Sequence, residues 1–354
     1  MSFPGFYLSR VWMGSKVSTK LLPSTIRPLA AHVKFTENCQ AKCVSCDYWK
    51  SRWQDHLDTD RAVDLLNQIG AVGIRTLRLT GGEPLLRKDL FQVLKRANTS
   101  RFKNVIIQTN GLLIKKLHKE INDSPIKKVC VSIDGLKATN DLIRGIKGYF
   151  DLGMEGIPLL RDKEVTIAVT LNRMSAAELG TLADVAHGVG AKVQYNILTR
   201  SLSFFKDGDI DSLWPERGDV VEITKFLRDV LKRPAYEVDY VTRHYNNENV
   251  DEPPCVLGYT QLFVMSNGDV LTGCYPLKPV GNVLQDKLET ILASEAYSRQ
   301  CVAMVRRECP GCTCGIETSL AMKHGASSAF FALSQLLPHP SHENEAVPTG
   351  VGQV

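Results

Sequence analysis

Short apolar runs and longer amphipathic stretches alternate along the first two thirds of the chain. Residues 105–108 (Val-Ile-Ile-Gln) and 165–171 are rich in β-branched residues, which favours strands. Residues 60–70 carry apolar side chains at helical spacing. The pattern predicts strands at 32–36, 75–80, 105–108, 128–133, 165–171 and 192–198, and helices at 60–70, 88–97, 112–121, 138–161 (with breaks) and 175–187.

Six strand–helix repeats predict an α/β fold with a parallel sheet and right-handed crossovers. We expect a partial (β/α)6 TIM-like barrel. In such a barrel the functional residues lie at the carboxyl ends of the strands, where the connecting loops gather.

The rhythm stops after residue 200. One helix is expected at 217–232, a hairpin at 262–283 around the turn Ser266-Asn267-Gly268-Asp269, and a helix at 286–306. We therefore expect a small C-terminal α+β domain after the barrel. The predicted organisation is an N-terminal extension (1–30), the barrel (31–200), a connecting or substrate segment (201–254), the C-terminal domain (255–325) and a tail (326–354).

The composition describes an ordinary globular chain, with 354 residues, 44% hydrophobic and 23% charged. No apolar run is long enough to span a membrane. The net charge of +5 is too mild to indicate nucleic acid, and we expect no such partner. Residues 1–36 contain no acid, which leaves open a transit peptide, a plain extension or a peripheral membrane contact.

Ten cysteines are unusual for a long chain whose start lacks a signal-peptide pattern. Clustered cysteines in that setting favour metal ligands in a reducing compartment, so we expect a cytoplasmic protein. Cys39, Cys43 and Cys46 follow the first predicted strand, with three and two residues between them. Three thiolates suit an iron–sulfur cluster and leave one iron open for another ligand. The alternative is a zinc site completed by a distant residue.

Further motifs follow the next predicted strands. Each is weak alone, because Gly-Gly and Asn-Gly pairs are usually turns. Their common position at strand ends behind the cysteines makes them a strong set. They are Gly81-Gly82-Glu83-Pro84, Thr109-Asn110-Gly111, Ser132-Ile133-Asp134-Gly135 and Arg144-Gly145.

With these motifs, residues 30–200 resemble the radical S-adenosylmethionine (SAM) superfamily. The resemblance implies that the three cysteines bind a [4Fe–4S] cluster, that SAM chelates its open iron, and that cleavage yields a 5′-deoxyadenosyl radical. It implies that Gly81–Pro84 hold the methionine amino group, and that Ser132 and Arg144 hold the ribose and carboxylate. Thr109, Asn110 and Asp134 are further candidate SAM contacts. Ser45 departs from the family's bulky residue, so Tyr48 or Trp49 is a candidate for the adenine.

A second cysteine set resembles the auxiliary-cluster region of the SPASM and twitch subfamilies, together with Asn267-Gly268-Asp269-Val270 and Gly281-Asn282-Val283. The resemblance implies one auxiliary [4Fe–4S] cluster, because a full SPASM region uses more cysteines. The alternative is a structural zinc site. Cys130 and Cys301 are expected to be buried thiols. The implied ligands are Cys255, Cys274, Cys309 and either Cys312 or Cys314.

The resemblance also implies an acidic flavodoxin or ferredoxin as electron donor. Residues 95–147 carry twelve Lys or Arg against four acids, which makes them a candidate docking face or simply a set of solvated helix ends. The expected activity is hydrogen abstraction from a peptide or a small molecule. The alternative is a non-catalytic iron–sulfur or zinc scaffold. Possible substrate contacts are Tyr195, Asn196, Asp239, Tyr240, His244 and Tyr245.

Overall fold

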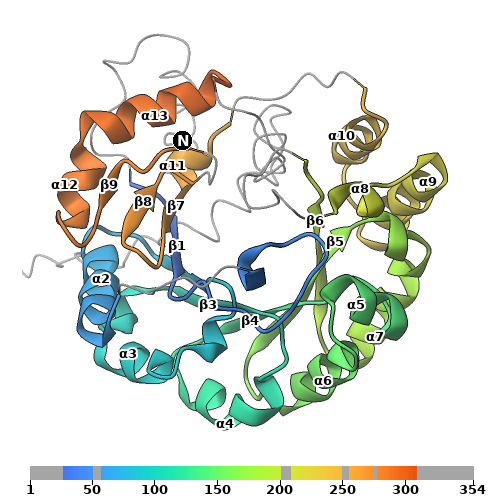
Figure 1. Cartoon of the computed structure of the whole chain (residues 1–354), viewed down its shortest axis with the longest axis horizontal. Helices are drawn as coiled ribbons and strands as arrows, with labels where there is room; N and C mark the ends of the chain where they lie inside the picture. The colour runs from blue at the N-terminus through green and yellow to red at the C-terminus, as the bar shows by residue number, and fades with distance from the viewer. Residues whose placement is uncertain (1–26, 51–56, 201–208, 249–254, 274–276, 309–354) are drawn as a thin grey trace, which may run out of the picture.

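Six parallel strands follow the predicted rhythm and form one curved sheet (Figure 1). A computed structural model of the chain describes residues 27–50, 57–200, 209–248, 255–273 and 277–308. Each strand pairs in parallel with the next along the chain. The strands are β1 (Ala30–Lys34), β2 (Thr76–Thr80), β3 (Asn104–Thr109), β4 (Lys128–Ser132), β5 (Glu164–Leu171) and β6 (Lys192–Ile197).

Helices cover the outer face of this sheet (Figure 1). Odd-numbered strand residues such as Val33, Leu79 and Ile107 are fully buried in the core beneath them. The even-numbered residues point to the concave side, because side chains alternate along a strand. The helices are α2 (Thr59–Ala71), α3 (Leu90–Arg96), α4 (Ile114–Asp123), α5 (Lys137–Arg144), α6 (Tyr149–Gly156) and α7 (Leu179–Gly188), with short turns η1 (Tyr48–Lys50), η2 (Pro84–Leu86), η3 (Thr99–Arg101), η4 (Ile157–Leu159) and η5 (Arg173–Glu178).

The predicted hairpin near the C-terminus extends the barrel sheet. Its first strand, β7 (Gln261–Val264), lies parallel to β1, and β8 (Asp269–Leu271) and β9 (Gly281–Asn282) follow in antiparallel order. The result is a nine-stranded sheet with β6 and β9 at its edges, so the barrel is partial and open. The expected C-terminal α+β unit is therefore joined to the barrel through main-chain hydrogen bonds.

The last predicted helix is two helices. Ser294 is extended and separates α12 (Leu288–Ala293) from α13 (Glu295–Val305), and its hydroxyl accepts a hydrogen bond from Tyr297 N at 3.1 Å. A serine cap of this kind begins a new helix. The prediction of one continuous helix was wrong at this serine.

The connecting segment holds more structure than expected. The predicted helix at 217–232 is α9 (Arg217–Lys225) followed by a π-helical turn, η7 (Phe226–Val230). The sequence analysis missed α8 (Ile210–Leu213) and α10 (Ala235–Tyr245). α10 is anchored by Tyr245, whose hydroxyl accepts a hydrogen bond from Leu198 N and donates one to Leu171 O, both at 2.9 Å.

The N-terminal segment considered for membrane contact and the tail at 326–354 lie outside the described residues. Across the ranges given above, no helix combines the length and the apolar character needed to cross a membrane.

Candidate functional site

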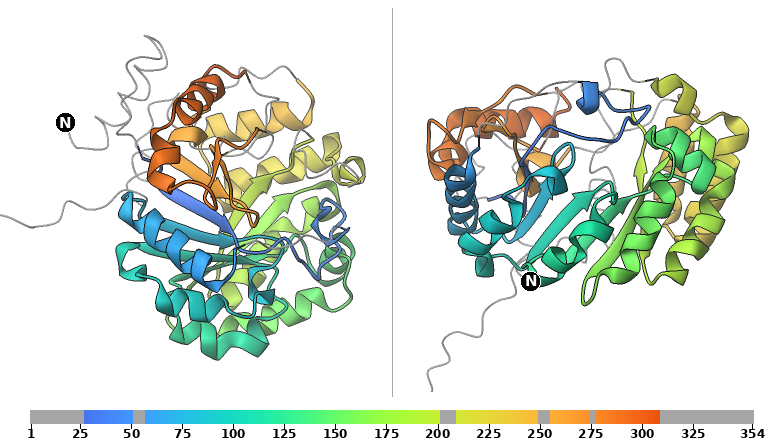
Figure 2. Two further views of the ribbon diagram at one scale, coloured as in Figure 1. Left: turned by 60° about the vertical axis from the view of Figure 1, so that its left-hand side comes forward. Right: turned by 60° about the horizontal axis from the view of Figure 1, so that its bottom comes forward.

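The cysteine loop leaves β1 and crosses the carboxyl ends of the strands, where it ends in the turn η1 (Figure 2). Cys39, Cys43 and Cys46 all lie on it and are half-buried. Burial raises the pKa of the Cys39 and Cys46 thiols to about 11. Among the described residues, no three His, Cys, Asp or Glu side chains are close enough to hold one metal ion.

The middle of the loop is tied to the end of α5. Lys42 N donates to Arg144 O at 3.1 Å, and Val44 N donates to Ile143 O at 2.9 Å. Gly145 ends α5 in the left-handed conformation, with φ of 68°. A Cβ on this residue would lie 2.3 Å from Lys42 O, so only glycine permits the contact. The backbone of Arg144 and Gly145 thus positions the cysteine loop, and the Arg144 side chain places a positive charge in the site.

The Gly81–Pro84 loop supports the start of the cysteine loop. Gly82 N donates to Thr36 O, and Glu83 N donates to Asn38 O, both at 2.8 Å. A Cβ on Gly81 would lie 2.1 Å from Thr36 O, and one on Gly82 would lie 2.3 Å from Asn38 O. The family resemblance gives this segment the role of holding the methionine amino group. The structure shows a further reason for the two glycines, which is the close approach of the chain's own backbone.

The Glu83 carboxylate is fully buried and holds the ends of β2 and β3 together. It accepts hydrogen bonds from Leu85 N at 3.0 Å, Thr109 Oγ1 at 2.8 Å and Asn110 N at 2.6 Å. Burial raises the pKa of Glu83 to about 7, although these hydrogen bonds act in the opposite direction. Asn110 in turn points its amide at the cysteine loop, with Nδ2 3.8 Å from the Cys39 Sγ.

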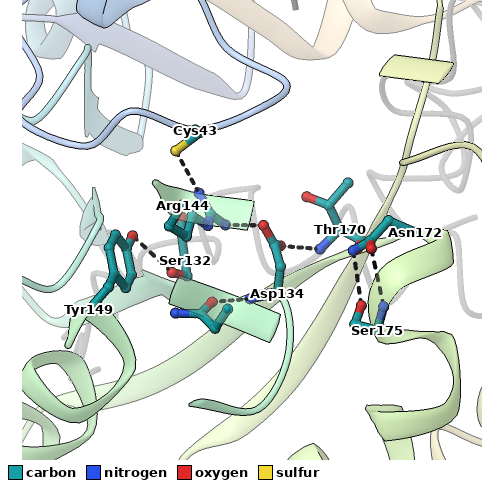
Figure 3. A network of polar contacts seen from close by, with 9 residues as sticks. Cys43, Ser132, Asp134, Arg144, Tyr149, Thr170, Asn172 and Ser175 are labelled. Atoms are coloured by element: carbon teal, nitrogen blue, oxygen red, sulfur yellow. Dashed lines mark hydrogen bonds and ion pairs between the residues drawn. The ribbon is translucent and has the colours of Figure 1, made fainter. Parts of the chain in front are cut away.

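Arg144 is the charged centre of the site (Figure 3). Its Nη2 lies 2.7 Å from Asp134 Oδ2, and its Nη1 lies 3.8 Å from the Cys43 Sγ. Asp134 is held in turn by Thr170 N, which donates to it at 2.7 Å. Burial alone lowers the pKa of the Arg144 guanidinium, but Asp134, Tyr149 and Cys43 together outweigh this and the net pKa is raised.

The Arg144 Nε is buried and has no hydrogen-bond partner among the residues that the structure describes. A buried donor of this kind is costly unless a ligand satisfies it. The half-buried Ser132 lies at the end of β4 in the same place, where its carbonyl accepts a hydrogen bond from Tyr149 at 3.2 Å (Figure 3). These residues therefore suit a ligand that has both an anionic group and hydroxyl groups. SAM is such a ligand, with its carboxylate and its ribose.

The two aromatic candidates for adenine contact differ. The Tyr48 hydroxyl contacts Lys34 Nζ beneath the cysteine loop, and the lysine lies 3.9 Å from the centre of the tyrosine ring. Trp49 is 36% exposed, and its Nε1 donates to Cys43 O at 3.4 Å. Trp49 therefore has a face that a ligand can reach.

Lys34 belongs to a buried polar group that the sequence analysis missed. Its Nζ lies 3.5 Å from Glu37 Oε2, and Ser266 Oγ donates to Glu37 Oε1 at 3.4 Å. Burial lowers the pKa of Lys34, and Glu37 opposes this. These contacts join the cysteine loop to the turn between β7 and β8. The one sign of this buried polar group in the sequence is Lys34 itself, a lysine at a strand position that faces the concave side of the sheet.

Only part of the second cysteine set falls within the described residues. Cys255 is buried, whereas Cys274, Cys309, Cys312 and Cys314 lie outside them. Their role as auxiliary ligands stays a prediction.

The Asn-Gly-Asp and Gly-Asn-Val motifs of this region form one turn. Asn282 Nδ2 donates to Asn267 O at 3.1 Å and to Asp269 Oδ1 at 2.9 Å. Gly268 has φ of 87°, and a Cβ on it would lie 2.6 Å from Asn282 Oδ1. These residues therefore shape the hairpin that follows Cys255.

Cys130 and Cys301 lie where buried thiols were expected. The Cys301 Sγ donates to Gly258 O at 3.3 Å, and burial raises its pKa to about 12. Gln194 Nε2 donates to the Cys130 Sγ at 3.5 Å.

Most of the candidate substrate contacts have structural partners. Tyr195 donates to Glu237 at 2.9 Å on the outer side of the sheet, and His244 Nε2 lies 3.0 Å from Leu198 O. Tyr245 anchors α10, as described above. Asn196 alone among the strand candidates is exposed on the concave face.

Two family models match the chain. The model of the radical SAM superfamily covers residues 33–179, and that of the SPASM iron–sulfur cluster-binding domain covers residues 255–314. The second match includes the cysteines that lie outside the described residues.

Curated relatives match parts of the chain. Fe-coproporphyrin III synthase of Methanosarcina barkeri (strain Fusaro / DSM 804) is 28% identical over 47% of this chain and 44% of its own. The sporulation killing factor maturation protein SkfB of Bacillus subtilis (strain 168) is 24% identical over 78% of this chain and 70% of its own. The chain spans about half the length of the first two curated relatives it matches, at 44% and 52%.

Solved structures share the fold. SuiB of Streptococcus suis bound to SAM matches with a TM-score of 0.63 at 17% identity, over 78% of this chain and 68% of SuiB. The same protein bound to its precursor peptide SuiA matches with a TM-score of 0.62, also at 17% identity, over 77% and 66%.

Proposed function

This chain belongs to the radical SAM superfamily and has a SPASM-type cluster-binding region, and on that premise we propose that it is a radical enzyme. When bound, the cluster and SAM would supply reductive cleavage to a 5′-deoxyadenosyl radical, which abstracts hydrogen from a substrate. One observation carries the proposal. Side chains from two other segments meet the cysteine loop: Asn110, directly after β3, lies at Cys39, and Arg144, at the end of α5, lies at Cys43.

The site residues have distinct proposed roles. The thiolates of Cys39, Cys43 and Cys46 hold the cluster, and three ligands leave one iron for SAM. Arg144 binds the SAM carboxylate, with the Nε that has no partner as one donor. Ser132 binds the ribose. The methionine ammonium contacts the backbone carbonyls of Gly81 and its neighbours, because the Glu83 carboxylate is already held by three donors.

We propose a peptide as the substrate class. Two similar proteins support this choice: SkfB is a maturation protein, and SuiB has been solved with its precursor peptide. We also propose that the net reaction is an oxidation. Other relatives are a synthase and a probable cyclase, so the family likeness alone does not specify this reaction type. An auxiliary [4Fe–4S] cluster bound by Cys255, Cys274, Cys309 and Cys312 or Cys314 would accept the electron or anchor the peptide.

A flavodoxin or ferredoxin of the cytoplasm is the proposed electron donor. A reducing compartment suits free cysteine ligands. The basic residues of 95–147 are the proposed docking face.

A non-catalytic iron–sulfur or zinc scaffold fits the site less well. A scaffold needs the cysteine loop alone. It does not need a buried Arg144–Asp134 pair with an unsatisfied donor beside that loop.

The test is anaerobic reconstitution with iron and sulfide, followed by incubation with SAM and dithionite. Mass spectrometry should detect 5′-deoxyadenosine from the wild type and none from the Cys39, Cys43 and Cys46 triple Ala variant. The variant should also lose about one cluster's worth of iron. Equal yields from the two proteins would refute the assignment.

A further inference from the structure

The concave face of the sheet is lined with polar side chains rather than with an apolar core. The strand register aligns His32 with Arg78 and Gln108 with Cys130, so these side chains share one face. Arg78 and Gln108 are half-buried and Gln194 is exposed, so water reaches this face. Further polar residues on it are Thr80, Ser132, Thr166, Thr170 and Asn196.

Arg78 is the uncompensated charge of this face. Within the described part of the chain, its guanidinium has no hydrogen bond or ion pair, and the titratable groups with which its charge interacts are Cys130 and His32. A guanidinium stays protonated in proteins, and a buried charge is costly without a partner.

The described acids on the barrel strands and on the loops at their carboxyl ends already have partners. Glu164 lies 3.1 Å from Lys128, Asp134 pairs with Arg144, and Glu37 pairs with Lys34. The Glu83 carboxylate accepts three hydrogen bonds. Arg78 therefore lacks a carboxylate that the described residues could provide.

His32 lies directly across from Arg78 on β1. It is 9% exposed, it stacks on Phe263 with ring centres 4.4 Å apart, and it has a side-chain hydrogen bond with Gln261. Its Nε2 is buried and has no hydrogen-bond partner within the described part of the chain. Burial, followed by the charge of Arg78, holds the pKa of His32 well below its usual range, so the imidazole is neutral. Two adjacent strands thus direct an unpaired cation and an unpaired polar nitrogen into the same space.

We propose that Arg78 and His32 form a subsite for a carboxylate of the substrate. Arg78 binds it through its planar fork. The His32 Nε2 donates a second hydrogen bond in the neutral tautomer that carries its proton on Nε2, with Nδ1 accepting from Gln261. The subsite lies two residues below the strand ends, about 7 Å from the level of the cysteine loop. A peptide with an acidic residue bound there would be held beneath the SAM site. That the bound carboxylate belongs to a substrate rests on the proposed function. That an anion binds here rests only on the surroundings of Arg78 and His32.

The test uses the reconstituted full-length protein and two matched probes, N-acetyl-glutamate amide and its neutral isostere N-acetyl-glutamine amide. Saturation-transfer NMR titrations measure their dissociation constants. The wild type should bind the glutamate probe about tenfold or more tightly than the glutamine probe, because hydrogen bonds to charged groups are the stronger ones. Arg78→Gln should abolish the difference. Arg61→Gln, on the exposed face of α2 beside Asp58, should leave it intact.

Several outcomes would overturn the proposal. Equal affinity of the wild type for both probes does so without any variant, as does a preference that survives in a folded Arg78→Gln protein. If Arg78→Gln fails to fold by circular dichroism, Arg78→Lys replaces it and should reduce the preference by removing the fork. If inorganic phosphate displaces the glutamate probe at a phosphate concentration well below the probe's dissociation constant, the site is a phosphate site instead. A wild type that makes no 5′-deoxyadenosine refutes the proposed function, whereas one that makes it but binds both probes equally refutes only this inference.

Discussion

The Gly82→Ala substitution tests whether the Gly81–Pro84 loop holds the cysteine loop in place. The added Cβ would lie 2.3 Å from Asn38 O and 2.5 Å from Glu37 O. Both are backbone atoms, so no side-chain rotation relieves the overlap. The segment before Cys39 must move away, and the hydrogen bonds from Gly82 N and Glu83 N are then lost.

The magnitude follows from these contacts. Overpacking of a close-packed region costs about 1–3 kcal/mol. Each lost hydrogen bond adds about 1 kcal/mol. We expect Gly82→Ala to lower the free energy of unfolding by about 3–5 kcal/mol and to reduce the iron retained by the barrel cluster.

The assay is urea unfolding of the protein without clusters, followed by iron analysis after reconstitution. Gly180→Ala, in α7, is the matched control because a Cβ there meets nothing within 4 Å. It should be neutral or slightly stabilising, since alanine favours the helix. A Gly82→Ala protein within about 1 kcal/mol of the wild type and with full iron content would refute the reasoning.

Three further predictions concern the cofactors and the electron donor. Arg144→Gln should weaken SAM binding about 10- to 150-fold in equilibrium dialysis, because it removes a charge-assisted hydrogen-bond donor; unchanged affinity would exclude the arginine as a contact. The reconstituted wild type should carry about eight irons and Cys255→Ala about half of them, whereas about four irons with one zinc in the wild type would favour a structural zinc site. Charge reversal of Lys115, Lys116 and Lys119 to Glu should slow flavodoxin-driven turnover at low salt and leave dithionite-driven turnover unchanged. Equal flavodoxin-driven rates would leave these lysines as ordinary solvated residues of α4.

The barrel was predictable from the sequence because its signals are local. Apolar β-branched runs and helical spacing identify each strand and helix, and the cysteines and the Gly-Gly-Glu-Pro segment each follow a strand directly. All six barrel strands occur within about two residues of their expected bounds.

Apart from the helix that Ser294 divides, the errors concern contacts between distant segments. The pairing of β7 with β1 joins residues more than two hundred positions apart, and nothing in either strand alone specifies it. α10 was missed because its buried face depends on Tyr245 reaching β5 and β6.

The site shows the same division. The motif residues could be named from the sequence, but their partners could not. Glu83 accepts hydrogen bonds from three donors of the chain, and Arg78 has no carboxylate partner among the described residues. Both facts depend on which strands lie side by side. A charged residue inside a strand is the sequence signal for such a site, but it does not reveal whether the charge is already paired.

Electron paramagnetic resonance of the dithionite-reduced protein, recorded with and without SAM, tests the central assignment most directly. The Cys255→Ala variant isolates the barrel cluster for this purpose. If Cys39, Cys43 and Cys46 leave one iron open to SAM, the g-values of the reduced cluster should shift when SAM is added. A reduced cluster whose spectrum is unchanged by saturating SAM would contradict the account.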